Sequence, residues 1–177
     1  MTLAPELTVV VVTGFGPFEG VDDNPSGALA RAIDGRRAAG ETVVGRVLPV
    51  SFHRGPEQTL EIAHLLQPRL VLGLGVAMQR TRVQVEWVAR CEVGDRPDVD
   101  GERPESLDGP AEVRSTLDVR ALARAMGVGT SGDAGAYVCN AWLYRVASGL
   151  DVPVGFVHLP PEGLDPERLL AGLAALL

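Results

Sequence analysis

The chain has few cysteines and no long apolar run, whereas many cysteines are typical of disulfide-bonded secreted proteins and long apolar runs are typical of membrane proteins. Its 177 residues include two cysteines, Cys91 and Cys139, in different sequence contexts, which argues against a disulfide framework. The longest apolar runs, such as Val9–Val12, have the length of a strand and fall far short of the about 20 residues of a membrane helix. No positively charged start precedes an apolar signal segment. We therefore expect a cytoplasmic protein that does not act on membranes.

Basic side chains are also fewer than acidic side chains. There are 16 of them against 23 acidic side chains, and the net charge is −7 at pH 7. Such a charge repels nucleic acids and anionic lipids, so we expect a small or peptidic partner and no nucleic acid. The length fits one domain over residues 1–177, which would bury roughly 70% of the surface of its unfolded chain.

Apolar, strand-like runs alternate with helix-like segments along the chain. A helix is expected to begin after Asn24, with Asn24 as its cap and Pro25 at its first position. The acidic segment 94–109 is rich in proline and glycine and is expected to be a long loop. The alternation predicts an α/β fold, a single-domain three-layer α/β/α sandwich around a largely parallel or mixed sheet. Strands are expected at 8–13, 43–50, 69–73, 82–89 and 152–158, and helices at 24–33, 55–66, 117–126, 139–148 and 165–177.

The strand expected at 82–89 carries an acidic residue on one face. Val83 and Val85 should share a face, which Trp87 would join if the strand continues, and Glu86 should lie on the other. A carboxylate at such a position is either solvated at the strand end or held by a partner such as an imidazole. Both interpretations stay open from the residues alone.

One cysteine and one histidine form the strongest chemical signal. Cys139 lies near the end of the run Gly135–Asn140, at a predicted helix start, and His158 follows 19 residues later at a predicted strand end. The first turn of a helix favours the thiolate, and a nearby imidazole can take the thiol proton. This pair predicts nucleophilic catalysis, although most free cysteines are buried and inert.

The loop 14–20 separates the first strand from the first helix. It lacks the Gly-Lys-Ser/Thr of phosphate loops and the glycine spacing of dinucleotide sites, so a nucleotide site is not expected. Phe15 and Phe18 lie in this loop rather than on a core periodicity. They either wall a ligand pocket or pack in the core, and the local sequence favours the core.

The spacing of potential ligands argues against a metal site. His53 and His64 lie on opposite ends of a predicted helix, and Cys91 has no second cysteine at a CxxC distance. The aspartates of segment 95–101 lack the ordered ligands and final glutamate of an EF-hand, so they are interpreted as a solvated acidic loop. No metal and no cofactor are expected.

Four sequence blocks carry a family resemblance. They are Thr13–Gly20 followed by Asn24-Pro25-Ser26, Gly75 followed eleven residues later by Glu86, Ser131–Asn140, and Val157–Pro160. In this order and spacing they resemble pyroglutamyl peptidase I, a family of cysteine exopeptidases that remove an N-terminal pyroglutamate. The resemblance implies a single α/β/α sandwich, pyroglutamyl peptides as substrates, no cofactor, and a homo-oligomer, either a dimer or a tetramer.

The resemblance also implies roles for matching positions. Cys139 would be the nucleophile, His158 the general base and then acid, and Glu86 the residue that orients the imidazole. Arg96 aligns with an arginine near the oxyanion. The substrate-binding positions would be Phe15, Phe18 and Asn24, and for the two phenylalanines this reverses the preference for core packing.

The chain departs from the family pattern in several places. Met78-Gln79-Arg80 stands where many relatives have Gly-Gly-Arg or Pro-Gly-Arg, Trp87 replaces a basic residue, and the segment 96–101 is shortened. Two alternatives therefore stay open: a related cysteine amidase for another cyclic or blocked acyl group, and a binding protein with the same fold that has lost turnover. The intact catalytic set argues against the second.

Overall fold

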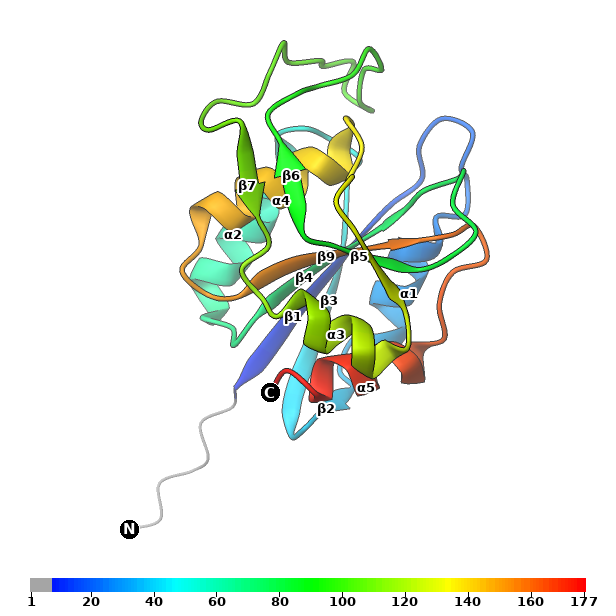
Figure 1. Cartoon of the computed structure of the whole chain (residues 1–177), viewed down its shortest axis with the longest axis vertical. Helices are drawn as coiled ribbons and strands as arrows, with labels where there is room; N and C mark the ends of the chain where they lie inside the picture. The colour runs from blue at the N-terminus through cyan, green and yellow to red at the C-terminus, as the bar shows by residue number, and fades with distance from the viewer. Residues whose placement is uncertain (1–7) are drawn as a thin grey trace.

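A computed structural model describes residues 8–177 and places a seven-stranded sheet at the centre of the molecule (Figure 1). The strand order is β2-β3-β1-β4-β9-β5-β8. Strands β3, β1, β4 and β9 run parallel, β5 is antiparallel to β9, and β8 is parallel to β5. The strands are β1 (Val9–Phe15), β2 (Arg37–Ala38), β3 (Glu41–Leu48), β4 (Val71–Val76), β5 (Gln84–Glu86), β8 (Gly129–Ser131) and β9 (Val154–Leu159), with β6 (Val88–Arg90) and β7 (Glu112–Arg114) in a separate pair.

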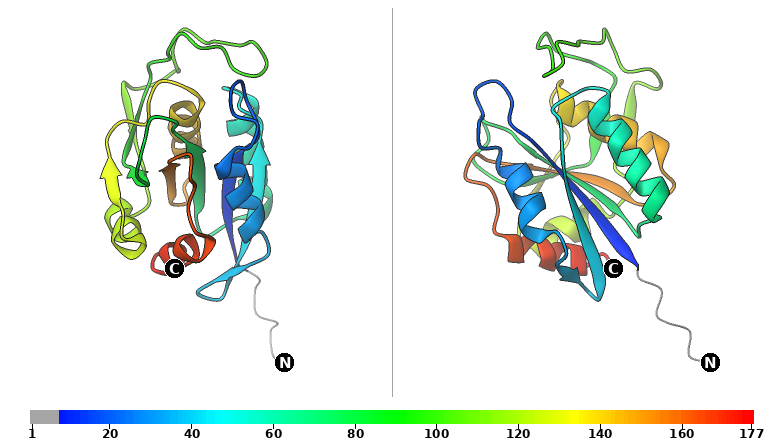
Figure 2. Two further views of the ribbon diagram at one scale, coloured as in Figure 1. Left: turned by 90° about the vertical axis from the view of Figure 1, so that its right-hand side faces the viewer. Right: turned by 180° about the vertical axis from the view of Figure 1, so that it is seen from behind.

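Helices cover both faces of the sheet, as the views in Figure 2 show. Along β1, Val10 and Val12 enter one apolar cluster, while Val11 and Phe15 enter another on the opposite face. The first cluster holds side chains of α1, α3 and α5, and the second holds side chains of α2 and α4. The predicted three-layer sandwich is confirmed. The helices are α1 (Pro25–Ile33), α2 (Arg54–Leu66), α3 (Val119–Met126), α4 (Val138–Gly149) and α5 (Pro166–Ala174).

The first helix begins as its sequence predicts. The Asn24 side chain accepts a hydrogen bond from the Ser26 N–H at 3.1 Å, and Pro25 occupies the first helical position. The other predicted helices are present with ends that differ by a few residues. The predicted strands at 43–50 and 69–73 are displaced to Glu41–Leu48 and Val71–Val76. The short strands β2, β7 and β8 were not predicted, because three or fewer residues carry no usable periodicity.

The strand predicted at 82–89 is divided at Trp87. Val83 and Val85 are buried on the expected face, and Glu86 lies on the other. Trp87 donates its N–H to the Ser131 carbonyl, and the chain then leaves the main sheet to form β6, which pairs antiparallel with β7. Trp87 lies beyond the end of β5 and is 38% exposed, so the continuous strand that would have carried it with Val83 and Val85 is not present.

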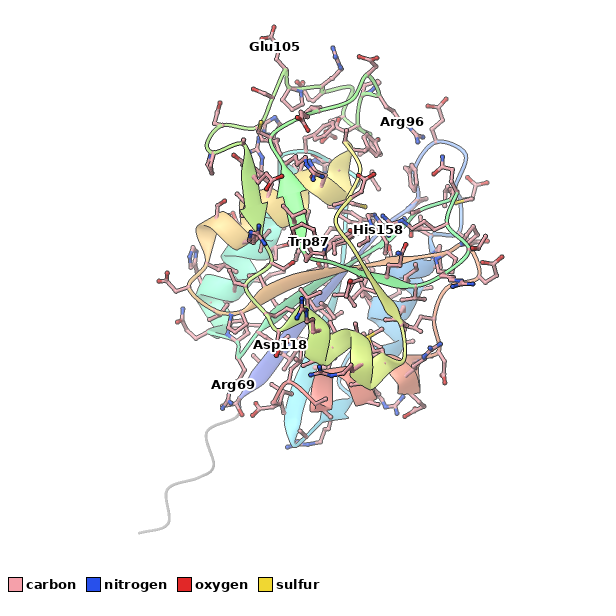
Figure 3. The ribbon with its side chains drawn as sticks, viewed as in Figure 1. Arg69, Trp87, Arg96, Glu105, Asp118 and His158 are labelled. Atoms are coloured by element: carbon pink, nitrogen blue, oxygen red, sulfur yellow. The ribbon has the colours of Figure 1, made fainter. Side chains whose placement is uncertain are left out.

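The loop 94–109 is present at the top of Figure 1, with Glu105 at its outer end in Figure 3. Asp98 is only 7% exposed and accepts hydrogen bonds from the backbone N–H groups of Phe52, Asp100 and Glu102. The interpretation of Asp98 as a solvated residue is therefore wrong, because its carboxylate satisfies buried backbone donors. Within residues 8–177, no three potential metal ligands gather in one place.

The remaining sequence expectations concern two histidines and the lipid bilayer. His53 is the N-cap of α2 and His64 lies in its last turn, and both are exposed at the helix ends where they were predicted. None of the helices between residues 8 and 177 is long and apolar enough to cross a membrane.

Candidate active site

The candidate catalytic side chains meet on the face of the sheet that α2 and α4 cover. On β9, the neighbours Val157 and Leu159 enter the opposite cluster, so His158 between them faces the α4 side. Glu86 ends β5, which pairs with β9, and Cys139 is the second residue of α4. Three segments that are distant in sequence therefore place these side chains together.

Glu86 and His158 form a buried pair. His158 Nδ1 lies 2.7 Å from Glu86 Oε1, and the two residues are 4% and 0% exposed respectively. The Phe156 ring packs edge-on against the imidazole with a centroid distance of 5.1 Å. Of the two interpretations of Glu86, the structure shows the carboxylate held by an imidazole. This contact fixes Nδ1 toward the carboxylate and leaves Nε2 for proton transfer.

Arg80 joins this pair, and sequence reasoning gave it no role. Its Nη1 lies 2.7 Å from Glu86 Oε1 and 3.0 Å from the side-chain oxygen of Gln84. Its Nη2 bonds to Ser131 Oγ at 3.3 Å and to the Asp133 carbonyl at 2.5 Å. One feature of the sequence could have indicated this role. Arg80 precedes by six residues an acidic residue that was expected on a strand, and a buried carboxylate requires a cation nearby.

Cys139 occupies the start of α4, where the first N–H groups have no intrahelical acceptor. Burial, followed by the charge of Glu86, raises the pKa of its thiol to about 12, although Arg80 and the backbone N–H of Cys139 itself act in the opposite direction. The predicted stabilisation of the thiolate by the helix is therefore outweighed by desolvation. In the resting protein Cys139 is a thiol.

Asn140 follows the nucleophile position and is 1% exposed. Its side-chain oxygen accepts the Arg90 N–H at 2.8 Å, and its side-chain nitrogen donates to the Arg90 carbonyl at 2.8 Å. These two bonds tie the first turn of α4 to β6. Since β6 follows β5 after one residue, the segment that carries Glu86 is joined directly to the helix that carries Cys139.

Gly75 on β4 makes room for the thiol. It is opposite His158 in the parallel register of β4 and β9. A Cβ at this position would lie 2.5 Å from Cys139 Sγ and 2.8 Å from Phe156 Cζ. Only a residue without a side chain allows the sulfur and the ring to remain where they are.

Cys139 lines two spaces. A cavity of about 460 Å³ contains Cys139 and His158 in its wall, together with Arg80, Arg96 and the turn 133–137. A smaller recess of about 30 Å³ has an apolar lining and no acidic or basic side chain. The recess is lined by Phe15, Phe18, Asn24, Val50, Val76, Tyr137, Val138 and Cys139.

The three predicted substrate-binding residues all line the recess. Phe15 is 3% exposed and also belongs to the apolar core. The two interpretations of Phe15, as a core residue and as a pocket wall, are therefore both correct. Asn24 donates to the Gly16 carbonyl at 2.9 Å, and its oxygen accepts from Ser26. The polar atoms of Asn24 therefore brace the loop around Phe18 rather than point freely into the recess.

Arg96 lies above this region on the long loop, as Figure 3 shows relative to His158. Its guanidinium is 5.1 Å from the ring centroid of Phe18 and 5.2 Å from that of Tyr137, and Nη2 donates to the Glu19 carbonyl at 2.8 Å. Arg96 lines the larger cavity and not the recess. Tyr137, which was not predicted, contributes to both spaces and donates its hydroxyl to the Pro97 carbonyl.

Comparisons with known proteins identify the family and the fold. The model of the pyroglutamyl peptidase family matches residues 8–166. The pyrrolidone-carboxylate peptidase of Cupriavidus necator is 34% identical over 96% of this chain and 91% of the relative, and that of Halalkalibacterium halodurans is 35% identical over 86% and 83%. The solved pyrrolidone carboxyl peptidase of Thermococcus litoralis superposes with a TM-score of 0.84 at 27% identity, over 96% of this chain and 91% of that one. The chain belongs to the pyroglutamyl peptidase family.

Proposed function

We propose that this protein is a cysteine exopeptidase that hydrolyses the N-terminal pyroglutamyl group from peptides. The observation that carries the proposal is the buried Glu86–His158 pair in the same pocket region as the Cys139 thiol, next to an uncharged recess. Family membership supports the same activity. We assign Cys139 as nucleophile, His158 as general base and acid, and Glu86 as the carboxylate that orients the imidazole.

The first step joins proton transfer to attack. Because burial keeps Cys139 protonated, His158 removes the proton as sulfur attacks the pyroglutamyl carbonyl carbon. The imidazolium that forms is stabilised by the negative charge of Glu86, which is already in contact with Nδ1. The reacting carbonyl oxygen acquires negative charge at the same time.

The oxyanion is stabilised by donors at the start of α4 and by Arg96. The backbone N–H of Cys139 is free of an intrahelical acceptor, and Arg96 lies in the wall of the larger cavity. The C–N bond then breaks, and His158 gives its proton to the departing peptide amine. Water, deprotonated by His158, hydrolyses the thioester and returns the thiol.

The chemistry of the recess lining, rather than its volume of about 30 Å³, favours a lactam ring. A pyroglutamyl group carries no charged amine, so apolar walls such as Phe15 and Phe18 bind it without burying a charge. A prolyl group has a similar ring but carries a charged secondary amine, and the recess offers it no acidic side chain. Specificity therefore follows from the absence of a counter-charge in the recess.

Release of a reporter amine from a pyroglutamyl amide tests the proposal. Alkylation of the protein with iodoacetamide should abolish release, and Cys139→Ala should lower kcat by about 10³-fold or more. The matched control is Cys91→Ser, which removes the other thiol and should retain full activity; a chelator should also have no effect. Normal turnover by Cys139→Ala, or a loss confined to Cys91→Ser, would refute the proposed nucleophile.

The family resemblance is the basis for proposing a dimer or tetramer that acts on pyroglutamyl peptides. The cytoplasm is proposed from the two cysteines, which lie in different sequence contexts and suit a reducing compartment. Leu65 and Trp87 are large apolar side chains that are 82% and 38% exposed, and an interface would cover such surface. Light scattering on the purified protein distinguishes a monomer from these oligomers.

A further inference from the structure

Arg80 supplies the permanent positive charge that contacts Glu86. Its Nη1 and His158 Nδ1 both lie 2.7 Å from the same oxygen, Oε1. Glu86 is 0% exposed, and its other oxygen, Oε2, has no hydrogen-bond partner among residues 8–177. A carboxylate enclosed in this way is strongly disfavoured unless a cation compensates it. A neutral imidazole cannot do so, because it carries no charge until it has taken a proton.

The same guanidinium also holds the turn that leads into α4. Nη2 bonds to Ser131 Oγ and to the Asp133 carbonyl, six residues before Cys139. A planar guanidinium has five N–H groups in a fixed arrangement, which suits simultaneous contact with a carboxylate and a turn. Arg80 therefore joins the acid-base pair to the segment that positions the nucleophile.

The charge of Arg80 acts on the thiol as well. Glu86 raises the pKa of Cys139 and Arg80 lowers it, so the arginine offsets part of the effect of the carboxylate. Without Arg80, the charge of Glu86 would disfavour the thiolate without this compensation. The attack on the carbonyl would then be slower.

We propose that Arg80 is a positioning residue of this active site, which keeps Glu86 charged and aimed at His158 and fixes the turn before Cys139. It acts through these groups and not through contact with the reacting carbonyl. The proposal rests on the proposed function, because it assigns Arg80 a role in the same reaction.

Steady-state kinetics of Arg80 variants test this role. Arg80→Met keeps the length of the side chain and removes the charge, and it should lower kcat by about 10- to 100-fold with a much smaller change in KM. Arg80→Lys restores a charge without the planar contacts and should recover part of kcat. The matched control is Arg90→Met, since Arg90 bonds to the Gly132 carbonyl in the same turn but pairs with Glu112 instead of Glu86.

Arg90→Met should change kcat by less than about threefold. If Arg90→Met and Arg80→Met lose the same activity, Arg80 only stabilises the turn and has no specific effect on Glu86. A double variant separates the two contributions further. In a Glu86→Gln background, where no carboxylate charge remains, Arg80→Met should add less than about threefold. Full additivity of the two losses would overturn the proposal.

The rate at which Cys139 is alkylated tests the role of Arg80 independently of peptide hydrolysis. In a Cys91→Ser background at pH 8, iodoacetamide should modify Arg80→Met at least about threefold more slowly than the parent, because the thiolate is less favoured. A parent that alkylates normally but releases no amine would refute the proposed function, and the alkylation rates would still decide the role of Arg80. Equal rates in both proteins would refute that role. Thermal unfolding identifies a variant that does not fold, in which case Arg80→Lys and the double variant decide.

Discussion

Replacing Gly75 by alanine tests where the Cys139 thiol lies in the working protein. The added Cβ would be 2.5 Å from Cys139 Sγ and 2.8 Å from Phe156 Cζ, whereas carbon atoms in contact are separated by about 3.5–4.0 Å. The thiol or the strand must therefore move by roughly 1 Å. A displacement of this size can cost about 10²-fold in rate, so kcat/KM for a pyroglutamyl amide should fall about 100-fold.

Two other glycines provide controls for the Gly75→Ala protein. Overpacking costs about 1–3 kcal/mol, and for a chain of this size each kcal/mol lowers Tm by about 2–4 °C. Gly73→Ala should show a similar loss of Tm, because its Cβ would meet Phe156 and Trp142 at 2.5 and 2.6 Å, and its three nearest atoms belong to these rings instead of the thiol. Gly129→Ala meets nothing within 4 Å and should resemble the parent.

The assay combines amine release with thermal unfolding of all three variants. The reasoning predicts that Gly75→Ala loses far more activity than Gly73→Ala at a comparable loss of Tm. If Gly75→Ala retains kcat/KM within about threefold of the parent, the thiol does not lie against β4 during turnover. If Gly73→Ala loses as much activity as Gly75→Ala, the effect comes from general strain and the positional argument fails.

Three further predictions concern the acid-base pair, the thiol and the recess. Glu86→Gln should lower kcat more than it raises KM, because the contact strengthens as the imidazolium forms, and His158→Ala should lower kcat further; unchanged kcat of Glu86→Gln at every pH would contradict this role. With a thiol pKa of about 12, the alkylation rate of Cys139 in a Cys91→Ser background should rise about tenfold per pH unit from pH 7 to pH 10, and a plateau in this range would show that the pKa is lower. Pyroglutamyl amides should be cleaved about 10⁴-fold faster than prolyl amides, and Phe18→Ala should weaken pyroglutamyl turnover while leaving alkylation of Cys139 nearly unchanged; a ratio below tenfold would place the ring elsewhere.

Local sequence patterns predict the layers of this fold well and its finer divisions poorly. The continuous apolar segments at β1 and β4 and the Asn24-Pro25 helix start were identifiable because their signals are local. The division of the strand at Trp87 was not, because the chain leaves the sheet where Trp87 bonds to Ser131, a contact across 44 residues. Backbone pairing at that distance has no local signature.

The candidate site shows the same limit. Residue type and spacing suggested the roles of Cys139 and His158. For Glu86 the residues allowed two interpretations, and only the fold shows that its carboxylate pairs with an imidazole. The raised pKa of Cys139 could not be predicted, because desolvation depends on the packing of the whole pocket and outweighs the helix start visible in the sequence. Arg80 escaped notice because its partners lie on two segments, one at Glu86 and one at Ser131 and Asp133, that are distant from each other in sequence.

The two hydrogen bonds between Asn140 and Arg90 make the site one mechanical unit. They close a loop in which the backbone from Glu86 to Arg90, the amide of Asn140 and the first turn of α4 move together. Local opening of α4 at its start would have to break these two hydrogen bonds and expose a buried amide, so fraying at Cys139 is suppressed. Amide hydrogens of β6 and of the first turn of α4 should therefore exchange with solvent in a single cooperative step. The positions of Cys139 and Glu86 would then be lost together in unfolding and would also be restored together in folding.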